Sequence, residues 1–172
     1  ANRERSRRDV SKLKLSPRSA EIQRLVGRSL RAAVDMRLLG DRTITIDCDV
    51  LQGDGGTRTA SVTGGFIALA LACRKMLDMG WITENPIKHC VAAVSAGIVG
   101  DVPMLDLCYE EDSSAMVDLN CVMDETGAII ELQGTGEGRS FTVAEQQELV
   151  RLCAGGIQTL IAKQKEILGG LD

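Results

Sequence analysis

The chain has 172 residues, of which 44% are hydrophobic and only 2% are aromatic, and its formal net charge is −4. This balance excludes a disordered or fibrous polymer and is typical of one globular domain with a core of aliphatic side chains. Because the only aromatic residues are one Trp, one Tyr and two Phe, base-stacking platforms are not expected.

The first 15 residues have no apolar periodicity and are predicted to form a basic arm. Ser16 as N-cap and Pro17 at the first helical position then predict the start of a helix, and Gly40 is predicted to end it. Residues 43–50 alternate polar residues with apolar and β-branched ones. This period of two predicts a strand.

A stretch from about Thr59 to Met79, rich in small apolar residues, is too long for a strand and predicts a buried helix that ends near Gly80. Its length could also suggest a membrane span. Three charged residues interrupt the stretch, which favours a helix in a protein core: Arg74, Lys75 and Asp78.

The second half of the chain predicts mainly strands, with a hairpin turn at residues 124–127. The expected strands are residues 90–99, 104–109, 115–123 and 128–133. A capping box of Thr142 and Glu145 then opens a last helix that runs to about Leu168. The element order predicts a single α/β sandwich domain over residues 1–172, with helices packed on a largely antiparallel sheet.

Charge is distributed unevenly along the chain. The first 42 residues carry 12 Lys and Arg against 5 Asp and Glu, a net +7, whereas the other 130 carry 8 against 19, a net −11. A basic segment on an acidic body points to a polyanionic partner, because neutralising phosphates supplies the sequence-independent part of nucleic-acid affinity. A solvated charged face is the alternative, and charge alone does not decide between the two.

The three glycines of residues 53–56 join the predicted strand to the buried helix. Such a turn directs free N–H groups and the helix dipole at one point, which favours an anion. The guanidinium of Arg58 and the hydroxyls of Thr57 and Ser61 make phosphate more plausible there than a carboxylate. The alternative is a plain glycine turn with Arg58 facing solvent.

The second candidate site is acidic. Asp112 and Asp118 stand six residues apart where two predicted strands meet, so the chain can bring their carboxylates together if it turns back between them. Hard oxygen ligands of this kind suit Mg²⁺, with phosphate and water completing the coordination sphere. A solvated acidic loop is the alternative.

The sequence also carries signals about the cellular compartment. Six cysteines lie in apolar surroundings without a CxxC pair, which is typical of buried thiols in a reducing cytosol. The start of the chain is polar and arginine-rich, unlike a signal peptide. We therefore expect a cytoplasmic protein without a membrane partner.

Four stretches closely resemble bacterial ribonuclease PH in the family's order: residues 21–31, 53–61, 106–123 and 133–138. The resemblance implies a ribosomal-protein-S5-domain-2-like fold and a ring-shaped homohexamer built as a trimer of dimers. It also implies an exoribonuclease that trims the 3′ ends of tRNA precursors. Such an enzyme uses inorganic phosphate and Mg²⁺, releases nucleoside diphosphates and can run in reverse as a nucleotidyltransferase.

The resemblance assigns roles to individual residues, each of which matches a position of the family's motifs. Arg18 and Arg58 match the phosphate-binding arginines, with Gly56, Thr57 and Ser61 around the same anion. Asp112 and Asp118 match the metal and acid carboxylates, and Asp118 is favoured as the acid. The arm matches the tRNA-contacting segment, with Arg3, Arg5, Arg7 and Arg8 as its basic residues.

Two departures from the family's pattern are visible. Gly53 stands where alanine is more usual, a small change. The family's chain also has strands of the same sheet before the arm, whereas the sequence printed here begins with the arm, either as a fragment or as a truncated protein. The function expected is phosphorolytic exoribonuclease, and the alternatives are a non-catalytic RNA-binding ring subunit and an incomplete domain that is inactive alone.

Overall fold

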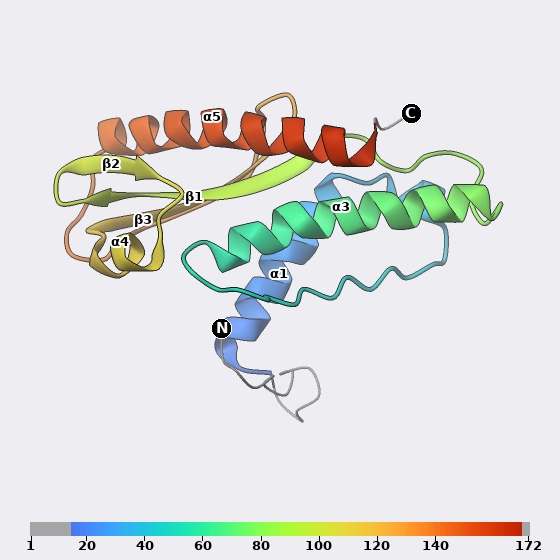
Figure 1. The fold of residues 1–172 in the computed structure, drawn as a ribbon, viewed down its shortest axis with the longest axis horizontal. Coiled ribbons are helices and arrows are strands. Elements are labelled where there is room, and N and C mark those ends of the chain that lie inside the picture. Colours follow the sequence, from blue (N-terminus) through green and yellow to red (C-terminus); the bar gives the residue numbers. More distant parts are fainter. Residues whose placement is uncertain (1–14, 170–172) are drawn as a thin grey trace.

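The computed structural model describes residues 15–169, so the predicted arm lies almost entirely outside the described residues. Figure 1 shows the elements that follow. In chain order they are α1 (Pro17–Ala32), α2 (Met36–Leu39), α3 (Thr57–Asp78), β1 (Val91–Val99), β2 (Val102–Leu105), α4 (Tyr109–Ser114), β3 (Val117–Asp124), β4 (Ile129–Gly136) and α5 (Val143–Leu168).

The four strands form one antiparallel sheet in the order β2-β1-β3-β4. Both long helices, α3 and α5, pack against β1, and α1 packs against α3 in turn. Residues 91–98 of β1 are therefore buried, since β1 is the strand that both helices cover. The predicted arrangement of helices on a largely antiparallel sheet is confirmed.

Local sequence signals predicted several element boundaries correctly. Ser16 caps α1, accepting a hydrogen bond from the backbone N–H of Ser19 at 3.2 Å. The capping box of α5 is present: the N–H of Glu145 donates to Thr142 Oγ1 at 3.2 Å, and the N–H of Thr142 donates to Glu145 Oε2 at 2.7 Å. These contacts join neighbours three residues apart, which explains why the sequence reveals them.

The predicted helix to Gly40 is wrong as a single element. It stops at Ala32, Val34 forms an isolated β-bridge with Ile87, and α2 begins only after Asp35. The side chain of Asp35 accepts from the N–H of Arg37 at 3.0 Å, a cap that starts a new helix and competes with continuation of the old one. Gly40, at φ 63°, ends α2.

The predicted strand at residues 43–50 is also wrong. The segment is irregular, and within residues 15–169 no strand pairs with it. Its alternation nevertheless has a structural basis, because Ile44 and Ile46 are partly buried against the core. Alternation reports which face is buried, whereas a strand also requires a hydrogen-bonded partner.

The predicted strand at residues 104–109 ends early, because β2 stops at Leu105. Asp106 follows with φ 57°, a left-handed conformation that redirects the chain into α4. Asp112 therefore lies on a short helix, and residues 115–116 connect this helix to β3, which carries Asp118.

The buried helix predicted from about Thr59 is α3. By length and composition alone α3 could cross a membrane, a weak criterion that core helices also meet. Val62, Phe66 and Cys73 are fully buried in the core. Of the cysteines, Cys73, Cys90, Cys121 and Cys153 are buried as expected, whereas Cys108 is half-buried and Cys48 is exposed.

Candidate functional site

The N-terminus of α3 presents its first backbone N–H groups without a side-chain cap. Its N-cap is Gly56, in the left-handed conformation at φ 65°. Gly55 lies so close to the next element that a Cβ there would approach the carbonyl oxygen of Leu107 to 1.9 Å. The two glycines thus provide a backbone conformation and a close approach that side chains would prevent. The uncapped end of a 22-residue helix can stabilise an anion.

The hydroxyls expected around the anion differ in availability. Thr57 is the first residue of α3, at the uncapped end. The Ser61 hydroxyl donates to the carbonyl of Thr57 at 2.8 Å, so its proton is used inside the helix. Both residues line a cleft of about 450 Å³ between α3 and residues 46–52. The Ser61 hydroxyl can donate to an anion only if its hydrogen bond to the Thr57 carbonyl breaks.

Arg58 lies on the first turn of α3 and forms an ion pair with Glu21 of α1, at 2.9 Å between Nη1 and Oε1. Its side chain is only 23% exposed, so it is held in place more firmly than a free surface arginine. Arg18 is exposed and precedes Glu21 by three residues, which places both on one face of α1. The two expected phosphate arginines therefore both neighbour Glu21, on two packed helices.

Asp118 lies in β3, one of the two inner strands of the sheet, opposite Gly97 of β1 and Thr135 of β4. Burial, and then the negative charge of Asp112, raise the pKa of Asp118 above its usual value. The charge of Arg58 and a 3.2 Å hydrogen bond from Asn120 Nδ2 act in the opposite direction. Asp118 therefore lies within electrostatic reach of both Asp112 and Arg58, which joins the acidic pair to the N-terminus of α3.

Three contributors to this site were missed by sequence reasoning. Glu137, which follows β4, also raises the pKa of Asp118, and Asn120 donates to the same carboxylate. Asp54 accepts a hydrogen bond from the N–H of Tyr109 at 2.6 Å and so connects the glycine turn with α4. The residues of this last bond are 55 apart in sequence, so only the fold reveals it.

A magnesium ion fits this donor set. Within the described part of the chain no group of three or more His, Cys, Asp or Glu side chains gathers as a metal site, so Asp112 and Asp118 remain a pair. A pair is sufficient, because Mg²⁺ usually binds one or two carboxylates and keeps water and substrate phosphate as its other ligands. Arg3, Arg5, Arg7 and Arg8 lie outside the described residues.

Two family matches place the chain in a class of protein, the 3′ exoribonucleases. The family "3′ exoribonuclease family, domain 1" matches residues 1–75, and "3′ exoribonuclease family, domain 2" matches residues 89–153. Ribonuclease PH of Syntrophomonas wolfei is 57% identical over 165 residues, covering 96% of this chain and 69% of the relative. Ribonuclease PH of Bacillus subtilis is 54% identical over 170 residues, covering 98% and 69%. The chain belongs to the ribonuclease PH family, whose members are phosphorolytic 3′-exoribonucleases.

Solved structures support the same fold. An archaeal exosome core superimposes with a TM-score of 0.63 at 23% identity, covering 88% of this chain and 66% of that one. The Archaeoglobus fulgidus exosome with RNA bound to the active site gives 0.61 at 22% identity, covering 86% and 62%. The chain thus spans about two thirds of the length of the proteins it matches.

Proposed function

We propose that this chain removes nucleotides from the 3′ end of RNA by phosphorolysis, with tRNA precursors as substrates. The observation that carries the proposal is that Arg58, beside the uncapped N-terminus of α3, and Asp112 both act electrostatically on the half-buried Asp118. This arrangement brings groups suited to a phosphate and groups suited to a leaving 3′-oxygen to one place. Each cycle breaks the terminal phosphodiester, releases a nucleoside diphosphate and is reversible as nucleotidyl transfer.

In this proposal the attacking phosphate binds at the N-terminus of α3. The N–H groups of Gly56 and Thr57, with the guanidinium groups of Arg58 and Arg18, supply the donors. Phosphate is already an anionic nucleophile at neutral pH, so positioning and charge neutralisation provide most of the acceleration. A catalytic base is not required. His89 instead lies 3.8 Å from Glu125 in another cluster.

In this proposal the leaving 3′-oxygen lies next to Asp112 and Asp118. The raised pKa of Asp118 increases its protonated fraction at neutral pH, which suits a donor of the proton that the departing 3′-oxygen takes up. Asp112 would hold Mg²⁺, which when bound neutralises negative charge on the reacting phosphates. Asp118 either donates this proton or, in its ionised form, serves as the second Mg²⁺ ligand, because a carboxylate binds the metal only when it is charged. Burial and the charge of Asp112 account for most of this rise in the pKa of Asp118, while Asn120 lowers the pKa and Glu137 raises it by smaller amounts.

The wider setting is also part of the proposal. The arginine arm binds the body of the tRNA precursor, six copies assemble into a ring as a trimer of dimers, and the enzyme works in the cytoplasm. The family membership supports these assignments, and the basic balance of the first 42 residues, 12 Lys and Arg against 5 Asp and Glu, supports the arm.

The test is to incubate the chain with a 3′-extended tRNA precursor, inorganic phosphate and Mg²⁺, and to identify the released nucleotides. Nucleoside diphosphates that depend on added phosphate support phosphorolysis, whereas monophosphates would mean hydrolysis. RNA binding without product would favour the non-catalytic ring subunit. A circular dichroism spectrum without helix and strand signals would favour the incomplete domain that does not fold alone. Native mass spectrometry measures the mass of the assembly and so tests the hexamer.

A further inference from the structure

We propose that Asp54 is a positioning residue of the phosphorolytic site, which ties the phosphate-binding turn to the helix that carries Asp112. The inference rests on the proposed function for its catalytic consequence. The bond itself is a separate observation: Asp54 Oδ1 accepts from the backbone N–H of Tyr109 at 2.6 Å.

The helix that Asp54 holds cannot be stable by itself. α4 has six residues, fewer than an isolated helix needs, because the first turn costs more conformational entropy than its hydrogen bonds return. Its N-terminus is held by two carboxylates. Glu111 accepts from the N–H of Cys108 at 2.9 Å within the helix, and Asp54 accepts from the next N–H from outside it. Both also complement the helix dipole.

A second contact brings the same two segments together. A Cβ on Gly55 would approach the Leu107 carbonyl oxygen to 1.9 Å, so the two backbones pack without a side chain between them. Gly55 sets the closeness of the contact, and the neighbouring Asp54 adds a directional, charge-assisted bond. The turn and the start of α4 are thereby fixed in distance and orientation.

This connection has a consequence for the site. Arg58 follows Asp54 by four residues and Asp112 follows Tyr109 by three, and both charges act on Asp118. Asp54 therefore sets the separation between the phosphate donors and the acidic pair. Phosphate and the departing oxygen must be held in line, so a shift of about 1 Å can cost on the order of 100-fold in rate.

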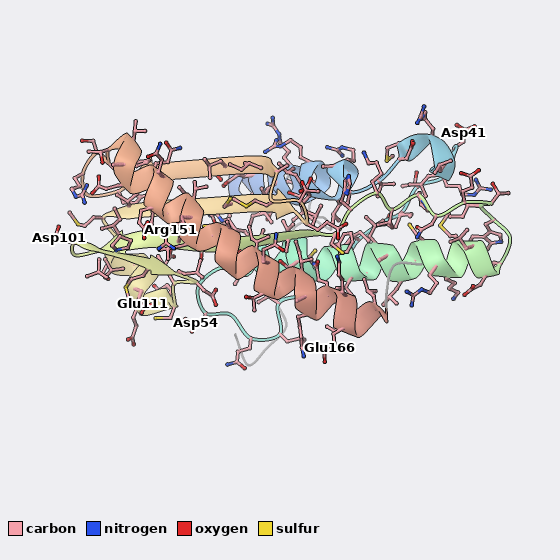
Figure 2. All side chains as sticks on the ribbon, turned by 90° about the horizontal axis from the view of Figure 1, so that it is seen from above. Asp41, Asp54, Asp101, Glu111, Arg151 and Glu166 are labelled. Carbon is pink, nitrogen blue, oxygen red and sulfur yellow. The ribbon has the colours of Figure 1, made fainter. Side chains whose placement is uncertain are left out.

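A matched control exists elsewhere in the fold. Asp35 also accepts a backbone N–H at the start of a short helix, from Arg37 at 3.0 Å. In Figure 2, Asp54 and Glu111 are labelled near one end of the molecule, whereas Asp41, which follows α2, is labelled at the other end. Asp35→Ala removes the same kind of cap outside the site.

The experiment compares Asp54→Ala, Asp54→Asn and Asp35→Ala by amide hydrogen exchange and by kinetics. We expect Asp54→Ala to speed exchange at the Tyr109 N–H and to lower kcat at saturating phosphate by ~10-fold or more, with RNA affinity unchanged. Asp54→Asn, whose amide oxygen can still accept, should restore most of both. Asp35→Ala should leave kcat within ~2-fold of the parent, since it alters no geometry at the site.

The outcomes separate this inference from the proposed function. If the Tyr109 N–H exchanges as slowly in Asp54→Ala as in the parent, the hydrogen bond between Asp54 and Tyr109 does not form. Faster exchange with kcat unchanged overturns the positioning role. If the parent itself yields no nucleoside diphosphate, the proposed function fails and the positioning role falls with it, while exchange still decides whether the bond forms.

Discussion

The Arg58 guanidinium donates to the Glu21 carboxylate at 2.9 Å, so the proposed phosphate ligand is already engaged by an anion of its own chain. The pair joins the first turn of α3 to α1 and orients Arg58. Glu21 is 46% exposed, so the pair is weak enough for a doubly charged phosphate to compete with it. Phosphate binding then exchanges one charge-assisted bond of Arg58 for another.

Replacing Arg58 with Ala should raise the KM for phosphate by at least ~10-fold, because a charge-assisted hydrogen bond contributes roughly 1.5–3 kcal/mol. RNA affinity should change little, since the proposal assigns Arg58 to the attacking phosphate and not to the RNA. Initial rates of precursor trimming over a range of phosphate concentrations measure this. A variant that trims as fast as the parent at limiting phosphate would remove Arg58 from the site.

Glu21→Gln is the companion variant for this prediction. It retains a hydrogen-bond acceptor and loses the charge that competes with phosphate. The KM for phosphate should therefore fall by up to about fivefold, because surface ion pairs contribute up to ~1 kcal/mol. A higher KM would instead show that the charge of Glu21 is needed to orient Arg58.

Asp118→Asn should separate activity from stability. The rate should fall at least ~10²-fold, the usual scale for losing a general acid or a metal ligand. Stability at neutral pH should rise, because burial and Asp112 raise the pKa of Asp118 and so disfavour its charged form in the folded state.

The raised pKa of Asp118 also predicts how the stability gained in Asp118→Asn depends on pH. A group whose folded pKa is raised contributes stability below its unfolded pKa and loses that contribution as pH rises through its folded pKa. The gain in melting temperature from Asp118→Asn should therefore be present at pH 7 and absent at a pH below the ordinary aspartate pKa, about 3.9. A variant less stable than the parent at pH 7 would contradict the burial effect.

Two glycines of the turn before α3 provide a third prediction. Gly55→Ala forces a Cβ into the Leu107 backbone, which cannot give way as a flexible side chain could, so the N-terminus of α3 must move away from α4. We expect kcat to fall on the order of 100-fold, the scale of a 1 Å displacement. Gly53→Ala is the control, because its Cβ would meet only Val50 and Thr57 at 3.7 and 3.8 Å. Equal kinetics for the two variants would refute this role of the close approach.

The parts of the fold predictable from sequence are those fixed by neighbours in the chain. The caps at Ser16 and Thr142 join residues three apart, and the glycine turn before α3 is visible in the sequence itself. Residues 43–50 and α4 could not be predicted in the same way. The first lacks a paired strand within residues 15–169, and the second depends on Asp54, whose bond partner is 55 residues away.

The residues of the candidate site could be chosen from the sequence, whereas their positions in space could not. The residue types at Arg58, Asp112 and Asp118 and the family's motif order were sufficient to choose them as candidates. Their convergence depends on the register that places Asp118 in the central part of the sheet and on the turn at Asp106. Sequence patterns report neither of these. Glu137 was missed for this reason, since it lies beyond β4 and reaches Asp118 only through the fold. Asn120 follows Asp118 by two residues on β3, so the alternation of strand side chains could have placed both on one face.

The arginine arm lies outside the described residues and remains a prediction from sequence. Arg5→Ala with Arg8→Ala should weaken trimming of a tRNA precursor more than trimming of a short single strand, because a short strand does not reach the arm. Each lost phosphate contact should also reduce the slope of log K against log salt by about 0.7 to 0.9, without altering base preference. The charge-matched control is Arg37→Ala with Arg151→Ala, two exposed arginines paired with Asp35 and Glu148. Equal losses on both RNAs with an unchanged salt slope would assign the arm a structural role, such as a contact between subunits.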